Sequence, residues 1–103
     1  MIKAIFLDVD GTILSFSTHK VPASAKSSLI QRYNKGIQII IATGRSFGNL
    51  AEISDIPYHG VVGLNGAEST LCDGTVVERH AISLELFRKS MELSKQYDFA
   101  IAV

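Results

Sequence analysis

Three short apolar runs constrain the fold of this chain more than any other feature. They read AIFLD at 4–8, GIQIIIA with a strand at 37–42, and GVVGL at 60–64. Continuously apolar runs of this length are typical of strands that are buried on both faces of a parallel sheet. The runs therefore predict three central strands, and the segments between them must cross over the sheet.

Helix signals separate these runs. A helical pattern opens at Ala23 or Ser24 and runs through Asn34, with Leu29, Ile30 and Tyr33 on one side. Lys35-Gly36 ends it, because glycine is the usual residue just past a helix. A shorter helix is predicted at about 46–53, before Pro57. The order β-α-β-α-β predicts parallel pairing with right-handed crossovers, which is an α/β fold with a Rossmann-like sheet.

The pattern changes after Asn65-Gly66. Two β-prone runs at 67–72 and 75–80 flank Asp73-Gly74, a strong hairpin signal. Residues 83–97 form an amphipathic pattern, and the last residues, DFAIAV, read as a strand. The side expected to face inward on this helix comprises Leu84, Phe87, Met91 and either Leu93 or Ser94. We place a soft boundary near residue 80, with a core half at 1–80 and the start of a second unit at 81–103.

Composition excludes several classes of protein. The 103 residues are 47% apolar and 19% charged, which suits one domain with a packed core. Ten basic and ten acidic residues form no basic cluster, which argues against nucleic acid as a partner. The single cysteine, Cys72, is expected to be a small buried apolar residue. With neither a signal peptide nor a membrane span in the sequence, we expect a cytoplasmic protein without a membrane partner.

Polar clusters follow all three predicted central strands. They are Asp8-Val9-Asp10-Gly11-Thr12, Thr43-Gly44-Arg45 and Asn65-Gly66. Taken alone, each has an ordinary explanation as a turn or a helix cap. In an open parallel sheet, however, ligands bind beyond the carboxyl ends of the strands. Three such clusters at successive strand ends therefore predict one functional site at that edge.

Asp8 and Asp10 carry the clearest chemistry. Residues i and i+2 of a strand project to the same face, so the two carboxylates are expected to lie close together. Like charges at short range raise the pKa of one partner. We therefore expect one ionised and one protonatable carboxyl group at the end of the first strand.

These motifs resemble a known family. DVDGT after the first strand and IATGR after the second are similar to the haloacid dehalogenase (HAD) superfamily of aspartate-nucleophile phosphotransferases. LNGA at 64–67, with no large insert after Gly11, resembles its Cof-type sugar-phosphatase branch. The resemblance covers essentially the whole chain. It implies that an α/β cap domain is inserted after the third strand.

The resemblance also implies roles for the two aspartates. Asp8 would be the nucleophile that forms an aspartyl phosphate, and Asp10 the general acid and later the general base. Mg²⁺ would be the cofactor, held by the Asp8 side chain and the Asp10 backbone carbonyl.

Phosphate binding falls to the remaining site residues. Gly11 would turn the chain sharply and present backbone N–H groups to the phosphoryl oxygens. Thr43 would supply a hydroxyl, and Gly44 an N–H at a helix N-terminus. Arg45 suits a bidentate contact with phosphate or substrate, although a solvated surface arginine is the alternative. Asn65 is expected to line the same crevice.

Two elements of the family pattern do not occur in these residues: a downstream lysine and a later acidic cluster. We therefore expect the N-terminal part of a longer enzyme that is inactive as 103 residues. The unpaired edge of the first strand would favour self-association.

The leading hypothesis is a Mg²⁺-dependent phosphatase of small phosphorylated metabolites, above all sugar phosphates. A phosphomutase, an inactive fragment and a phosphate- or metal-binding module are the alternatives. A receiver-type signalling domain is disfavoured, because Leu64-Asn65 occupies the place of its phosphorylated aspartate.

Overall fold

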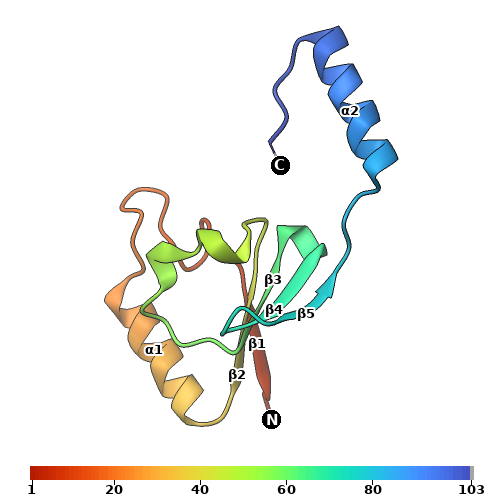
Figure 1. The fold of residues 1–103 in the computed structure, drawn as a ribbon. Coiled ribbons are helices and arrows are strands. Elements are labelled where there is room, and N and C mark those ends of the chain that lie inside the picture. The colour runs from red at the N-terminus through yellow and green to blue at the C-terminus, as the bar shows by residue number, and fades with distance from the viewer. Residues whose placement is uncertain (103) are drawn as a thin grey trace.

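A five-stranded mixed sheet organises the chain, and the computed structural model describes residues 1–102 of it (Figure 1). The strands lie in sequence order across the sheet. They are β1 (Ala4–Leu7), β2 (Gln38–Ala42), β3 (Gly60–Gly63), β4 (Glu68–Leu71) and β5 (Val76–Arg79). β1, β2 and β3 are parallel, and β4 and β5 extend the sheet as an antiparallel hairpin. The predicted α/β class is confirmed.

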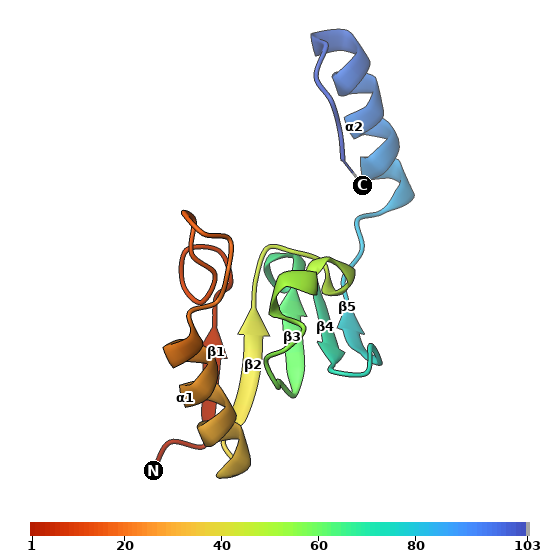
Figure 2. The ribbon, with the colours of Figure 1, turned by 90° about the vertical axis from the view of Figure 1, so that its left-hand side faces the viewer.

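Helix α1 (Ala23–Asn34) covers one face of the parallel strands, beside β1 and β2 (Figure 2). Its bounds match the prediction, and it ends where Gly36 takes a φ of 79°. Leu29 on the inner side of α1 is buried against the alternate β2 residues Ile39 and Ile41. The helix therefore closes the core over the strands that carry the polar clusters.

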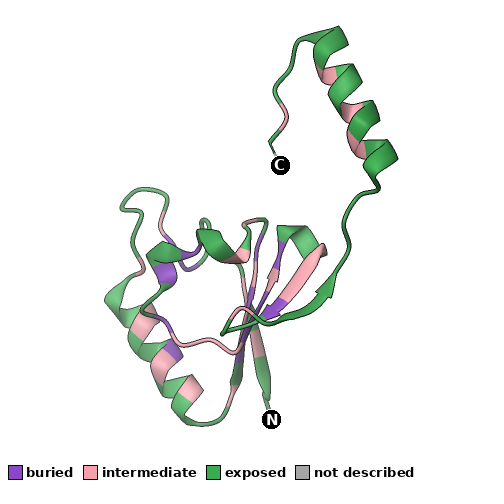
Figure 3. Cartoon of the chain, viewed as in Figure 1, coloured by how far each residue is buried: buried purple, intermediate pink, exposed green. Residues whose placement is uncertain are grey.

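The opposite face of the sheet is open, which corrects one expectation. β1 was expected to be buried on both faces, but its residues are exposed or half-buried, and the Phe6 side chain is 65% exposed (Figure 3). Val77 on β5 is 64% exposed. The described residues supply no second layer of helices, so the apolar side chains of this face remain in solvent.

The connection between β2 and β3 is also not as predicted. Instead of one helix at 46–53, it forms two short 3₁₀ turns, η1 (Phe47–Asn49) and η2 (Ala51–Ile53). Gly48 and Asn49 are poor helix formers, and so short a segment gains little from helix propagation. The connection is held by packing, because Leu50 and Ile53 are buried in the core.

The hairpin of β4 and β5 forms as predicted around Asp73-Gly74. Cys72, however, is exposed and not buried. It lies in the turn just past β4, where its side chain has no core to enter.

Helix α2 (Leu84–Tyr97) matches the predicted bounds, and its N-terminus is capped by Ser83, whose side chain accepts the N–H of Leu86. Both ribbon views show α2 standing away from the sheet (Figures 1 and 2). Its expected inward side is therefore open, with Leu84 62% exposed and Met91 37% exposed. No residue of α2 is buried.

Residues 98–102 form no strand, because no neighbouring strand lies beside them; Val103 falls outside the described residues. The sheet ends at Arg79, close to the boundary placed near residue 80, and the division into 1–80 and 81–103 stays a prediction. Within residues 1–102 no helix has the length and apolar character needed to cross a bilayer.

Candidate active site

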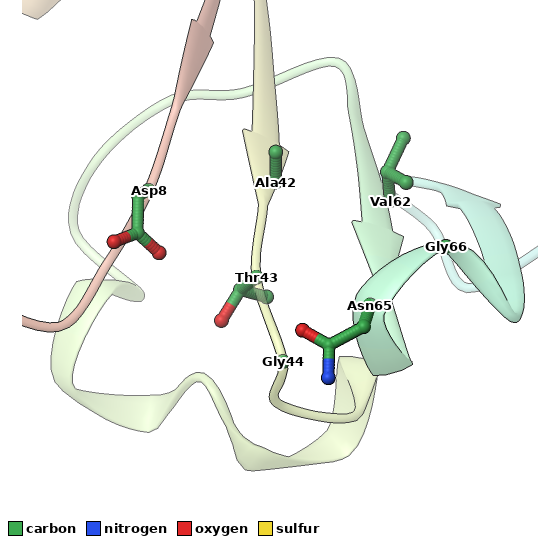
Figure 4. A pocket seen from close by; sticks show the side chains of 7 residues that line it. All are labelled: Asp8, Ala42, Thr43, Gly44, Val62, Asn65 and Gly66. Atoms are coloured by element: carbon green, nitrogen blue, oxygen red, sulfur yellow. The ribbon is translucent and has the colours of Figure 1, made fainter.

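A pocket of about 360 Å³ lies beyond the carboxyl ends of β1, β2 and β3 (Figure 4). The strand ends that carry the predicted site residues meet there, as the parallel topology requires. Its lining comprises Asp8, Ala42, Thr43, Gly44, Val62, Asn65 and Gly66. Asp8, Thr43, Gly44 and Asn65 are therefore together in one cavity, while Gly11, Asp10 and Arg45 lie beside it.

The end of β1 is shaped by a tight turn around one carbonyl. The carbonyl oxygen of Val9 accepts the N–H groups of Thr12, Ile13 and Leu14 at 3.2, 3.2 and 2.9 Å. Gly11 takes a φ of 75°, where side chains are disfavoured, and its N–H donates to the carbonyl of Leu14. This turn leaves Asp8 exposed at the pocket, with the Thr12 hydroxyl 3.4 Å from its carboxylate.

Backbone hydrogen bonds join the ends of β2 and β3. Thr43 N–H donates to the carbonyl of Val62 at 2.9 Å, and Asn65 N–H donates to the carbonyl of Thr43 at 3.2 Å. Leu64 and Asn65 adopt left-handed φ values of 51° and 54°. Left-handed residues other than glycine store strain and often mark functional sites. Here the left-handed turn places the Asn65 side chain beside Gly44, just past the end of β2 (Figure 4).

Asn65 and Gly44 are matched to each other. The Asn65 carboxamide oxygen lies 3.0 Å from the point where a Cβ on Gly44 would sit. A side chain at position 44 would crowd the amide, so the close approach of Asn65 to the backbone requires glycine there.

Neutral donors line this side of the pocket. Thr43 is buried, and its Oγ1 accepts the N–H of Arg45 at 3.1 Å, which leaves the hydroxyl hydrogen free to donate. The N–H of Gly44 makes no hydrogen bond with any of residues 1–102. The sequence predicted that this N–H lies at a helix N-terminus. This prediction is wrong, because only the short turn η1 follows Gly44.

Asp10 does not line the pocket, and its carboxylate forms a bidentate ion pair with Arg45. The Nε–H of Arg45 donates to Asp10 Oδ2 at 2.9 Å, and an Nη2–H donates to Asp10 Oδ1 at 2.7 Å. Hydrogen bonds from Arg45 hold the pKa of Asp10 below its ordinary value, and they raise the pKa of Arg45 in turn. The pKa of Asp10 therefore moves opposite to the direction expected from crowding by Asp8.

Two partners of Arg45 were missed in the sequence. Its Nη1 donates to the Glu52 carboxylate at 3.0 Å and to the carbonyl of Asn49 at 3.2 Å. The pKa of Glu52 is lowered, first by its own backbone N–H and then by the charge of Arg45. No sequence pattern indicated these contacts, because they depend on how the η1 and η2 turns fold back.

The oxygen donors at the end of β1 suit Mg²⁺ in kind. In residues 1–102 no three His, Cys, Asp or Glu side chains converge on one point. The Asp8 carboxylate is exposed at the pocket, and the Asp10 carbonyl oxygen accepts no hydrogen bond from the described residues. Mg²⁺ is commonly held by one or two protein oxygens, with water and phosphate completing its shell. These two donors fit that pattern.

Comparisons with known proteins gave one family match and several similar structures. A family model described as haloacid dehalogenase-like hydrolase matches residues 5–103. Among curated proteins none matches the sequence.

Solved structures resemble the chain over nearly its full length. One is BT1666 of Bacteroides thetaiotaomicron, described among phosphatases of the HAD superfamily, with 53% identity over 95% of this chain and a TM-score of 0.89. Another is the HAD subclass IIB sugar phosphatase BT4131, with 35% identity over 92% of this chain and a TM-score of 0.77. The present chain spans 37% and 38% of the length of these two proteins.

Proposed function

The chain belongs to the haloacid dehalogenase-like hydrolases, since their family model matches residues 5–103, and we propose that its site hydrolyses small phosphate monoesters. The observation that carries the proposal is the pocket at the ends of three parallel strands. It presents the exposed Asp8 carboxylate opposite Thr43, Gly44 and Asn65, with donors available at the Thr43 hydroxyl and the Gly44 N–H (Figure 4). A nucleophile facing anion-binding groups is the arrangement that phosphoryl transfer needs.

In the first step, a carboxylate oxygen of Asp8 attacks phosphorus while the bond from phosphorus to the leaving oxygen breaks. Asp10, which takes up a proton as the substrate binds, gives that proton to the leaving oxygen, and Asp8 becomes an aspartyl phosphate. In the second step, water attacks the phosphorus, its proton passes to Asp10, and the Asp8–phosphorus bond breaks. The acid is regenerated and inorganic phosphate leaves.

The remaining site groups bind the phosphoryl oxygens. The Thr43 hydroxyl, the Gly44 N–H and the Asn65 amide all donate without bringing a charge that would attract Asp8. Asp8 and the Asp10 carbonyl would hold Mg²⁺, which would supply positive charge against the phosphate when bound.

Sugar phosphates are the substrate class that we propose. Support comes from the 35% identity with a subclass IIB sugar phosphatase over 92% of this chain. The chain spans 37% and 38% of the length of these two relatives. The proposed activity is therefore that of the full-length protein that its gene encodes.

The test is turnover of a panel of sugar phosphates by that protein in the presence of Mg²⁺, compared with an Asp8→Asn variant. We expect release of inorganic phosphate from at least one substrate, and none from the variant. Movement of phosphate to a second hydroxyl would indicate a phosphomutase. Binding of inorganic phosphate without turnover of any substrate would indicate a binding module and would overturn the proposal.

A further inference from the structure

Arg45 uses nearly all of its hydrogen-bonding capacity on protein groups. A guanidinium carries five N–H donors in a rigid plane. Two of them form the fork on Asp10, and Nη1 serves Glu52 and the carbonyl of Asn49. The Arg45 side chain is 20% exposed, less than the 45% and 44% of Asp10 and Glu52. The arginine is thus the enclosed centre of three acceptors.

The acceptors of Arg45 belong to two different segments of the chain. Asp10 follows β1 in a turn, whereas Asn49 and Glu52 belong to the β2–β3 connection. That connection is anchored by the buried side chains of Leu50 and Ile53, which flank Glu52 in the sequence. Glu52 is therefore tied to the core, and it fixes the outer end of the guanidinium plane. With that end fixed, the Nε and Nη2 edge faces Asp10.

We propose that Glu52 is a positioning residue, which orients Arg45 so that Arg45 holds the Asp10 carboxylate at a set place beside the pocket. The catalytic consequence rests on the proposed function, because Asp10 is its acid and base. Without Glu52, Arg45 would keep its charge but lose its fixed orientation. The Asp10 carboxylate would then sample several positions, and proton transfer to the leaving group would suffer.

Stability is not the expected readout. Exposed ion pairs contribute little to stability, so loss of Glu52 should hardly change unfolding. The direct readout is hydrogen exchange at Arg45 Nε–H, followed by NMR at constant pH. These 103 residues hold four arginines, at 32, 45, 79 and 88, and an Arg45→Lys variant identifies the Arg45 signal.

The variants are Glu52→Ala and Glu52→Gln, because the glutamine amide oxygen can still accept from Nη1. We expect exchange at Arg45 Nε–H to become several-fold faster in Glu52→Ala and to stay near the parent rate in Glu52→Gln. Arg79 is an internal control, since its Nε–H donates to Glu68 at 2.6 Å, far from the substitution in sequence. Unchanged exchange at Arg45 in Glu52→Ala would overturn the inference, whatever the activity.

The second readout is the dependence of turnover on the leaving group. In Glu52→Ala, kcat should fall more with a sugar phosphate than with p-nitrophenyl phosphate, whose leaving group needs little protonation. Glu52→Gln should recover most of this loss. Equal losses with both substrates would overturn the positioning role. Absence of turnover in the parent protein would instead count against the proposed function. The exchange measurement would still show whether Glu52 orients Arg45.

Discussion

Asp8 and Asp10 are two residues apart, yet the fold gives them different surroundings. Asp8 faces the pocket, and Asp10 is bound by the Arg45 fork at 2.7 and 2.9 Å. While this pair is intact the pKa of Asp10 stays low, so Asp10 is ionised at neutral pH. To act as an acid it must therefore gain a proton as the substrate binds, while Arg45 keeps its carboxyl group in place. The separation of the two roles is therefore a matter of position, and the two aspartates should respond differently to substitution.

We expect Asp8→Asn to abolish formation of the phosphoenzyme with every substrate. Asp10→Asn should still allow attack by Asp8 when the leaving group is p-nitrophenolate. With a sugar phosphate, loss of the general acid should lower the rate roughly 10²–10⁴-fold. Because Asp10 also activates the water, the covalent intermediate should accumulate in Asp10→Asn. Intact-mass spectrometry after rapid acid quench measures the adduct. A phosphate adduct on the Asp8 variant would contradict this assignment of roles.

Gly44 offers a second prediction at the same scale. A Cβ there would lie 3.0 Å from the Asn65 carboxamide oxygen, so in Gly44→Ala the amide must shift by a few tenths of an ångström and loses its present position in the pocket. We expect affinity for orthophosphate to fall by about tenfold or more, as for loss of one hydrogen bond to a charged group. Gly48→Ala is the control, because no atom lies within 4 Å of its Cβ position. Titration calorimetry gives both affinities, and an equal effect of the two substitutions would rule out the Asn65 contact as the cause.

At the scale of the elements, β2 supports the site from inside the core. Its alternate residues Ile39 and Ile41 are fully buried, and the strand leads directly into Thr43, Gly44 and Arg45. The loop before β3 is tied to the same strand, because the N–H of Ile39 donates to His59 Nδ1 at 3.1 Å. The His59 ring in turn stacks on Tyr33 of α1, with centroids 4.5 Å apart. Packing against β2 therefore sets the positions of two of the three strand ends.

Ile41→Ala should accordingly lower the free energy of unfolding by about 2–5 kcal/mol, since it removes buried methyl groups and leaves a cavity. Ile82→Ala is the matched control. That side chain is 64% exposed, and the change should stay within about 0.5 kcal/mol. Urea denaturation followed by circular dichroism measures both. Similar losses for the two variants would mean that β2 does not carry the core as described.

At the scale of the whole molecule, the chain leaves large apolar surfaces uncovered. One face of the sheet exposes Phe6 and Val77, and within residues 1–102 β1 is an edge strand that pairs with β2 alone. An unpaired apolar edge is a template for association with another chain. Helix α2 exposes a second apolar surface that includes Leu84. The two surfaces lie apart in both ribbon views, so substitutions can separate their effects (Figures 1 and 2).

We predict that the 103-residue chain self-associates through the sheet. Phe6→Ser should shift sedimentation towards the monomer, because it removes a large apolar side chain of β1 that is 65% exposed. Leu84→Ser should leave the distribution unchanged. Analytical ultracentrifugation over a range of concentrations measures this. A monomeric parent chain, or a shift caused by Leu84→Ser alone, would contradict association through the sheet.

Local sequence patterns determined much of this protein. The apolar runs, the glycine after α1 and the Asp-Gly turn predicted every strand of the sheet, α1 and α2, because backbone propensity and turn chemistry act over a few residues. The polar clusters likewise indicated the edge of the sheet at which the pocket lies, since parallel topology brings strand ends together. The family followed from the same motifs.

Tertiary structure decided the rest. The connection after Arg45 became two 3₁₀ turns, Cys72 lay in solvent, and residues 98–102 formed no strand, because each outcome depends on neighbours distant in sequence. The same holds for the site: only the folded chain brings Glu52 to Arg45, and Arg45 to Asp10 across 35 residues. The type of a side chain shows what it can bind, but long-range packing selects the partner that it meets. For this reason Asp8 faces the pocket while Asp10 is bound by Arg45.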